Sequence, residues 1–565
     1  MLSFGAISEV PLSSARDEEG LPFGGFAQLA ALASGTPSLL RVSSGASVVS
    51  AAAFGTMRVV VIASGSALVT VAASGTPNYT LYAATREFIS RSADQVANQP
   101  FYGTMQQSIQ FDQSIITGSG FGQVTIAWGE ITLINSDGYY DDVIGKYAAD
   151  GRRLVLKVGD QRRIDSTGYD GFFTVFDGIA TGSHVEEGVM RVYLRDRTYQ
   201  LEVPASSSIY GGTGGVDGTD DNKGKRKPRA FGYCSNVTPA FISPTLKLFQ
   251  VNDGAVQAIS AVYSRGNAVT FDQDYASTSA LLAATVVSGR YATCKAAGLF
   301  RVNFILEGDI TADVEGANAG SFVSTSADIV KRLLAGFEIE PASFAAVNAL
   351  QPAPVGYFVE TGSDATIADV IADIMGAIGG YGGFQRDGIK FEVGLFRAPA
   401  GVPSASYTRI DIIEIKREQL PQGISPPPYR YRVAWGRNFT TQTDIASSVS
   451  AARVAFLAEQ YRLSEASDSD IKIDHPLAQD PQVVEAYFRD QADATTEATR
   501  LLSLYGLASY SLYRIVLKSK PFVHRIGELV WVTYPRWDLV EGRLLRIVSV
   551  SEKIESNEVE IVGFG

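Results

Sequence analysis

The chain has 565 residues, which is enough for three or four domains that each bury a core of their own. Hydrophobic residues make up 45% of it and charged residues 19%, beside 55 glycines, a balance that excludes a disordered chain and is typical of turn-rich β proteins. The formal charge of −12 argues against ordinary nucleic-acid binding, because an acidic surface repels phosphates, although DNA could still pass along such a wall.

The sequence has neither a run of 18 apolar residues nor the basic-then-apolar start of a secretory signal. We therefore expect no membrane-spanning segment and folding in a cytoplasm. The only cysteines, Cys234 and Cys294, are expected to be small buried thiols in a reducing compartment.

Residues 1–80 are expected to form an N-terminal β-meander. Glycine recurs every ten residues, at Gly35, Gly45, Gly55, Gly65 and Gly75, with small and β-branched residues between, as in Met57–Ile62 and Ala67–Ala72. Turn signals at this interval favour short strands joined by turns.

Strict alternation of apolar and polar residues between about 80 and 205 predicts antiparallel sheet with one buried face. Asn135–Gly138 is expected to form a tight turn between two such runs. Three acids in and after it, Asp137, Asp141 and Asp142, could gather a calcium ion, but their spacing is not that of an EF-hand, and solvated acids at a turn are the favoured interpretation.

Residues 210–229 are rich in glycine and then in basic residues, which predicts a flexible surface loop at a domain boundary. Its basic residues could contact an acidic neighbouring subunit or DNA, or could simply be solvated. These residues are Lys223, Lys225, Arg226, Lys227 and Arg229.

The second half of the chain contains helix signals. Apolar residues at helical spacing predict an amphipathic helix over 366–378, with Thr366 and Asp369 as its capping pair, followed by a hairpin that turns at Asp387–Gly388. Further helices are expected at 326–335, capped by Ser326, and over about 483–505, before the last fifty-five residues return to strands.

Sequence signatures of catalysis are missing. The three histidines, His184, His475 and His524, are far apart and have no paired metal spacing, so each is expected to be a surface or packed residue. Neither cysteine has a nucleophile signature, and no nucleophile elbow or phosphate loop occurs. We therefore predict no catalytic, cofactor or metal site, although a pair of carboxylates from distant strands could not be recognised in this way.

Several stretches together resemble the hub, or tail-tip, proteins of siphophages and of gene transfer agents. The similarity runs from about residue 80 to the C-terminus, and its motifs keep a specific order. The stretches are Leu81–Phe88, Gly129–Gly138, Lys227–Pro239, Val262–Gly266, Thr311–Gly316, Gly527–Arg536, Gly542–Val548 and Val559–Gly565.

This resemblance implies a mainly β, multidomain α+β chain with two tube-like antiparallel β-barrel domains. It implies a homotrimer with pseudo-sixfold symmetry at the distal end of a tail tube, and it brings no catalytic residues. The chain departs from hub relatives that hold an iron–sulfur cluster, because it lacks their cysteine set, so no cluster is expected. Expected partners are the tail tube and distal tail proteins, the tape-measure protein and a tail-tip spike or central fibre protein, with genomic DNA passing the lumen without specific binding. The chain would thus be assembled in the host cytoplasm and reside in the tail tip of the virion.

The resemblance and the composition shifts together suggest five domains. After the N-terminal meander at 1–80 come a first tube-like domain at 81–209, a β-rich inserted domain at 210–322, an α+β hub domain at 323–428 and a second tube-like domain at 429–565.

The principal alternative is a carbohydrate-binding or glycan-cleaving tail protein, since aromatic residues can stack on sugars. The four tryptophans, Trp128, Trp435, Trp531 and Trp537, could serve in this way, but in alternating strands they are more often core or interface residues. A bacterial surface adhesin is a weaker alternative, because no export signal is apparent.

Overall fold

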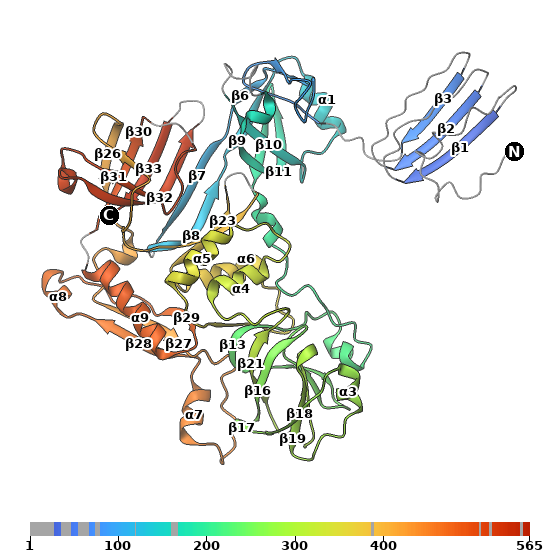
Figure 1. Cartoon of the computed structure of the whole chain (residues 1–565), viewed down its shortest axis with the longest axis vertical. Helices are drawn as coiled ribbons and strands as arrows, with labels where there is room; N and C mark the ends of the chain where they lie inside the picture. Colours follow the sequence, from blue (N-terminus) through green and yellow to red (C-terminus); the bar gives the residue numbers. More distant parts are fainter. Residues whose placement is uncertain are drawn as a thin grey trace. The chain divides into compact units, whose positions relative to one another are not determined.

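The computed structural model describes residues 27–34, 47–54, 67–73, 80–118, 120–159, 168–385, 389–507, 510–518, 522–553 and 558–565. The chain divides into two compact units, Met1–Ala83 and Ala84–Gly565 (Figure 1). Both are dominated by strands, and the second adds several helices, so the expected mainly β architecture with some α is confirmed.

The N-terminal unit is a three-stranded sheet of β1 (Ala27–Ser34), β2 (Ser47–Phe54) and β3 (Ala67–Ala73). Its strands pair in parallel, with Ala27 beside Ser47 and Ser47 beside Ala67, so the expected meander is corrected, because a meander pairs successive strands antiparallel. Neighbouring strands are twenty residues apart, which is twice the glycine spacing. The five repeated glycines and Met57–Ile62 lie outside the described residues.

Two β sheets of the larger unit come from the two ends of its sequence. One has the order β10-β11-β12-β9-β6, and the other has the order β25-β31-β32-β33-β30-β26, extended by β7 and β8. The strands of the first are β6 (Met105–Gln107), β9 (Glu130–Asn135), β10 (Arg153–Val158), β11 (Phe173–Glu186) and β12 (Gly188–Arg195). Those of the second are β7 (Gln110–Thr117), β8 (Gly120–Ala127), β25 (Ala405–Tyr407), β26 (Ile412–Glu418), β30 (Leu512–Leu517), β31 (Leu529–Val532), β32 (Arg543–Lys553) and β33 (Glu558–Phe564).

The middle of the chain adds two five-stranded sheets whose apolar faces share one core, which includes Phe249, Val262, Phe300 and Val314. Smaller sheets pair β4 with β5, β23 with β24, and β27 with both β28 and β29. The strands are β4 (Phe88–Ile89), β5 (Pro100–Phe101), β13 (Arg229–Val237), β14 (Ala240–Ser243), β15 (Leu248–Gln250), β16 (Val256–Ser264), β17 (Asn267–Ala268), β18 (Thr270–Asp274), β19 (Arg290–Cys294), β20 (Leu299–Val302), β21 (Ile310–Ala317), β22 (Gly356–Val359), β23 (Gly380–Phe384), β24 (Phe391–Leu395), β27 (Arg430–Trp435), β28 (Arg462–Ser467) and β29 (Val484–Phe488).

The helices expected at 326–335 and 366–378 are present as α4 and α6. Thr366 and Asp369 make the expected capping box at the start of α6, and α4 is confirmed but capped by Thr325 rather than Ser326, since Thr325 Oγ1 accepts the Asp328 amide. The helices are α1 (Tyr139–Lys146), α3 (Thr278–Ala283), α4 (Ser326–Leu333), α5 (Pro341–Leu350), α6 (Ile367–Gly376), α7 (Ala451–Ala458), α8 (Asp470–Asp474) and α9 (Gln491–Leu502). None of the helices in the described ranges is long and apolar enough to cross a bilayer.

The helix expected within 483–505 is wrong in its first part. Val484–Phe488 is the strand β29, which pairs in parallel with β27, and helix α9 begins only at Gln491. The β-branched and aromatic residues of this stretch fit a half-buried strand beside β27, so tertiary pairing outweighs the local helical pattern. The hairpin of β23 and β24 is confirmed, and its turn at Asp387–Gly388 lies outside the described residues.

Candidate assembly surface

The two end sheets of the larger unit contain the same five-stranded arrangement. We call β6, β9, β10, β11 and β12 the first β module, and β26, β30, β31, β32 and β33 the second β module. If the strands of each module are numbered one to five along the chain, both sheets have the spatial order 3-4-5-2-1. This order is β10-β11-β12-β9-β6 in the first module and β31-β32-β33-β30-β26 in the second. Every neighbouring pair in both modules is antiparallel.

Details of the pairing also repeat. The second and fifth strands are joined by six residue pairs in each module, from Glu130 with Tyr193 to Asn135 with Gly188, and from Leu512 to Leu517 in the other. Against the fifth strand, the fourth strand of each module carries one extra residue, Thr181 in β11 and Val548 in β32, at places two residues apart when the modules are aligned on the ladder of second and fifth strands. Since bulges of this kind are retained as features of a fold, their recurrence supports an internal duplication.

The β7–β8 hairpin joins the two modules. It continues directly from β6 and leads directly into β9, yet β7 pairs antiparallel with β32, from Ser114 beside Ser549 to Gln110 beside Lys553 (Figure 1). The β8–β7 ladder therefore continues into the sheet of the second module, while the ends of the hairpin run along the chain into β6 and β9 of the first.

An aromatic cluster fixes the tip of this hairpin. The Phe121 ring stacks on Phe396 with centroids 4.2 Å apart and meets Phe564 edge-on at 5.0 Å. All three rings are buried, and Ile115 of β7 belongs to the same core. Because stacked and edge-on pairs add to the stabilisation from burial, this cluster holds the hairpin firmly against the last strand of the chain.

The three acids considered for calcium each have another role. Asp137 accepts the Tyr139 amide at 3.2 Å, Asp141 accepts the side-chain amide of Asn135 at 2.8 Å, and Asp142 pairs with Lys146 at 3.3 Å. They form the turn and the first turn of α1. Within the described ranges, no group of three or more His, Cys, Asp or Glu side chains is placed to hold a metal ion.

The glycine-rich and basic stretch at 210–229 is a compact closed loop, which corrects its prediction as a flexible one. Tyr210 is fully buried and donates to Gln250 Oε1 at 2.6 Å, while Asp217 accepts the Gly211 amide at 3.0 Å and the Thr213 hydroxyl at 2.8 Å. These two anchors close the loop from inside.

The basic residues of this loop do not act as one patch. Arg226 pairs with Asp364 at 3.0 Å, and Arg229 donates to the Ala205 carbonyl at 3.0 Å. The Lys227 ammonium lies over the Tyr210 ring. Of the five, only Lys223 and Lys225 are exposed, so the field available to an acidic partner is small.

The histidines and cysteines are dispersed as the sequence suggests. His184 and His475 are exposed, whereas His524 is buried, hydrogen-bonded to Tyr407 at 2.5 Å and 3.6 Å from Glu528. Both cysteines are buried free thiols, and burial raises the pKa of Cys234 to about 12. A thiol so protonated is a poor nucleophile.

A cavity of about 490 Å³ lies between β8, the end of β12, α6 and β23. Trp128 lines it, but this ring packs against Phe111 and Phe176 at 4.6 and 4.7 Å. Among the described residues that line the cavity, the only charged ones are Arg195, which pairs with Glu202, and Asp196. Glycoside hydrolysis requires two carboxylates, so this lining does not supply the usual catalytic pair.

The remaining tryptophans are not grouped. Trp531 of β31 is 39% exposed, whereas Trp537 packs beside the core of the second β module and Trp435 beside the core around α4 and α9. A sugar-stacking platform of several tryptophans is therefore not formed.

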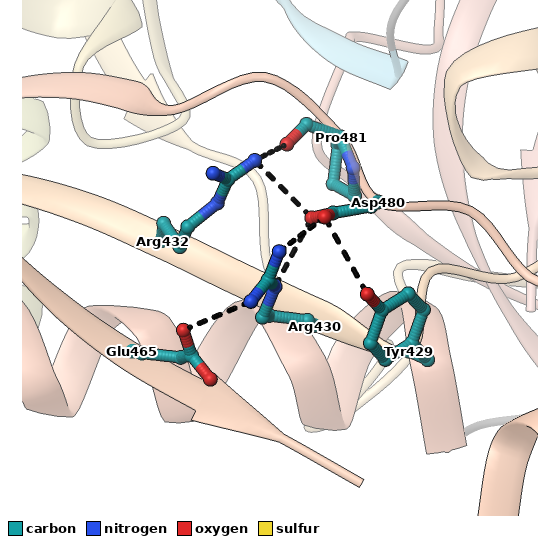
Figure 2. Close-up of polar contacts among 6 residues, drawn as sticks. All are labelled: Tyr429, Arg430, Arg432, Glu465, Asp480 and Pro481. Atoms are coloured by element: carbon teal, nitrogen blue, oxygen red, sulfur yellow. Dashed lines mark hydrogen bonds and ion pairs between the residues drawn. The ribbon is translucent and has the colours of Figure 1, made fainter. Parts of the chain in front are cut away.

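A polar network joins strand β27 to the segment that precedes β29 (Figure 2). Asp480 accepts from Tyr429 at 3.4 Å, from Arg430 and, at 3.2 Å, from Arg432, and Arg430 also reaches Glu465. The hydrogen bonds from Arg430 lower the pKa of Asp480. A carboxylate held in its ionised form cannot act as a general acid near neutral pH, so the network is best described as a structural clamp.

Comparisons with known proteins give structural similarity only. No family model and no curated protein matches the chain. A tail protein from Neisseria meningitidis MC58 is similar at 10% identity and a TM-score of 0.36, covering 82% of this chain and 92% of its own.

The 43 kDa tail protein of prophage MuSo2 from Shewanella oneidensis is similar at 8% identity and a TM-score of 0.33, covering 83% of this chain and 96% of its own. Prophage tail protein gp18 from Listeria monocytogenes EGD-e is similar at 13% identity and a TM-score of 0.23, covering 56% of this chain and 83% of its own. All three are named as tail proteins, the class that the sequence resembles. TM-scores below 0.5 do not establish a shared function, so the chain's own geometry has to support the assignment.

Sequence reasoning missed the residues that matter most for this surface. The hairpin Gln110–Ala127 alternates like any other strand pair, and nothing in its residues indicates that it leaves one module for another. The one available signal was the direct succession of β6 and β7, with no loop in which the chain could turn back.

Proposed function

We propose that the chain is a structural tail protein of a bacteriophage and acts as a hub, in which three copies form a ring at the distal end of the tail tube. The repeated five-stranded module carries this proposal. Three copies would contribute six such modules, which is the number needed to meet a hexameric tube with one module per tube subunit. A ring of three could at the same time face a threefold spike or central fibre.

The junction between the modules supports the same proposal. Adjacent modules of one chain are already joined through the β7–β32 ladder, so they have a fixed lateral contact. A contact that joins different surfaces of two similar units closes into a ring when the rotation between them divides a full turn. Sheet edges, which are an aggregation hazard in a monomer, would serve as the joints.

Charge is compatible with a channel for DNA. Each copy has a formal charge of −12, so three copies bring −36 to the ring. An acidic wall repels the DNA backbone and lets it slide without specific binding. In this account the remaining partners are the tail tube and distal tail proteins, the tape-measure protein and the tail-tip spike or fibre. The chain would have no catalytic role.

Cleavage or binding of host glycans is the alternative. The dispersed tryptophans and the lining of the cavity give it no specific support, and the two ideas differ in a simple assay. Release of reducing sugars from host polysaccharide by the purified protein would favour the alternative.

The hub proposal is tested by the mass of the full chain in solution. Mass photometry over a range of concentrations is expected to show a species of three times the 60.4 kDa chain mass, and negative-stain images of that species should show rings. A chain that stays monomeric at every concentration, and is found as single copies in virions, would contradict the proposal.

A further inference from the structure

The fourth strand of each β module extends beyond its third-strand neighbour, and this leaves a stretch of open edge. In the second β module, β31 pairs with Arg543–Arg546 of β32, and β7 fills the following stretch, Ser549–Lys553. In the first β module, β10 pairs with Phe173–Ile179 of β11, while Gly182–Glu186 pairs with β12 alone among the described residues.

The two stretches coincide in part, since His184–Glu186 of β11 corresponds to Ser549–Ser551 of β32. The two modules can be aligned on the ladder between their second and fifth strands. The ladder ends at Gly188, beside Asn135, in the first module and at Val559, beside Leu517, in the second. Gly188 therefore corresponds to Val559, and Arg191, three residues later, corresponds to Val562. Their partners on the fourth strands are His184 and Ser549, and Ser549 begins the ladder with β7. The end of the open edge of β11, His184–Glu186, is thus the counterpart of the first part of the edge that β7 fills.

The filled edge also indicates which strand would occupy the open one. The strand that pairs with β32 is β7, which follows β6, the first strand of the first β module. β7 pairs with β32 through the edge that faces away from β8. The first strand of the second β module is β26, which pairs only with β30 within the described part of the chain. Its residue Ile413 is 62% exposed.

We propose that the edge Gly182–Glu186 of one copy pairs antiparallel with the free edge of β26 in the neighbouring copy. This inference rests on the proposed ring, and it names the joint between subunits that corresponds to the β7–β32 joint within a subunit. Alternating the two joints around the axis would connect six modules with no unpaired edge at these positions.

Backbone hydrogen bonds would provide most of the affinity of this pairing for an extended partner. Side-chain charge does not oppose it, because β26 carries two basic residues, Lys416 and Arg417, beside two acidic ones, Glu414 and Glu418, and the exposed Glu186 of β11 is already paired with Arg191 of its own module.

Disulfide trapping tests the pairing directly. We would co-express two differently tagged full-length variants, His184→Cys in one and Lys416→Cys in the other, with Glu414→Cys and Glu418→Cys to cover alternative registers. Cysteines on facing strands lie within disulfide range, and the native thiols are buried, so mild oxidation is expected to give a two-chain species carrying both tags. Ser551→Cys is the matched control, because its edge is already filled by β7 and should give no such species.

Proline substitution provides a second readout. The variants His184→Pro and Val185→Pro each remove one backbone N–H donor from β11. Because neighbouring residues of a strand point their N–H groups to opposite sides, one of the two variants loses a donor toward β12 and the other loses a donor toward the open edge. The second of these leaves the ladder to β12 intact. That variant, identified by unchanged circular dichroism, is expected to weaken trimer formation roughly tenfold or more through lost ladder hydrogen bonds.

The outcomes separate this inference from the hub proposal. A wild-type trimer that gives no mixed-tag disulfide in any register, and that keeps its affinity with either proline, overturns the joint while leaving the ring intact. A wild-type chain that never forms a trimer overturns both.

Discussion

Removing the Phe121 ring should detach the β7–β8 hairpin from the second β module. Phe121 is 8% exposed and contacts Phe396 and Phe564, which are each 1% exposed. The variant Phe121→Ala leaves a cavity at the point where the hairpin tip meets the last strand of the chain. The strands β7 and β32 should then separate more often than they do in the wild-type protein.

The magnitude follows from the burial and the ring contacts. Truncation of a buried phenylalanine costs about 3–5 kcal/mol, and the two close aromatic pairs account for about 1–3 kcal/mol of that cost. If the loss falls on local opening of the hairpin, amide exchange should accelerate by roughly two to three orders of magnitude, because each 1.4 kcal/mol is about tenfold.

Hydrogen exchange measured by mass spectrometry is the appropriate assay, since a single unfolding free energy is not defined for a chain of several domains. Peptides that cover Gln110–Thr117 and Ser549–Lys553 should lose protection together in Phe121→Ala. The control Phe173→Ala removes a ring that is 55% exposed on β11 and should change exchange of these peptides little. Equal effects of the two variants, or unchanged protection in Phe121→Ala, would refute the assigned role of the aromatic cluster.

Three further predictions concern the clamp and the buried polar groups. Asp480→Asn should weaken the clamp and remove part of the acid sensitivity of the fold. In the wild-type protein the folded pKa of Asp480 lies below its ordinary value of 3.8, so the stabilisation from the clamp is present above pH 3.8 and is lost as the pH falls through the folded pKa. Melting curves recorded between pH 2 and 6 would detect this difference between the two proteins. Glu497→Ala should lower the protection of helix α9 against hydrogen exchange by about 3–5 kcal/mol, because Glu497 is 2% exposed and its loss leaves Arg500 without its carboxylate. Asp142→Ala in the exposed pair of α1 should lower the protection of that helix by less than about 1 kcal/mol. Cys234, with a pKa of about 12, should not react with a thiol reagent at pH 8 until the protein is unfolded, and rapid labelling of the native chain would contradict its burial.

Local patterns predicted local structure well. The helix α6 follows from apolar spacing and from the Thr366 and Asp369 pair, because both signals depend on residues within one or two turns. The strand β30 follows from alternation in the same way. Such elements could be predicted because the interactions that define them are close in the sequence.

Long-range pairing could not be predicted in this way. The stretch Val484–Phe488 was expected to be helical, and it is a strand because β27, fifty residues earlier, offers it a parallel partner. The closed loop at 210–229 depends on the hydrogen bond from Tyr210 to Gln250, which composition does not reveal. Residues whose partners are distant carry no local signature.

The same limit applies to the assembly surface. The resemblance to tail hub proteins implied two tube-like domains, but the repeated strand order became visible only from the register of the ladders. The second strands of the modules, Glu130–Asn135 and Leu512–Leu517, share their place in the sheet without an evident shared sequence. Backbone geometry is repeated here, and many combinations of apolar residues satisfy it.

A three-dimensional reconstruction of the assembled full chain by electron cryo-microscopy tests the hub proposal most directly. The proposal predicts a threefold ring in which the first and second β modules alternate at the same radius, at successive sixths of a turn around an open axis. Modules that lie at different radii, or a particle in which only one module of each chain borders the axis, would contradict it.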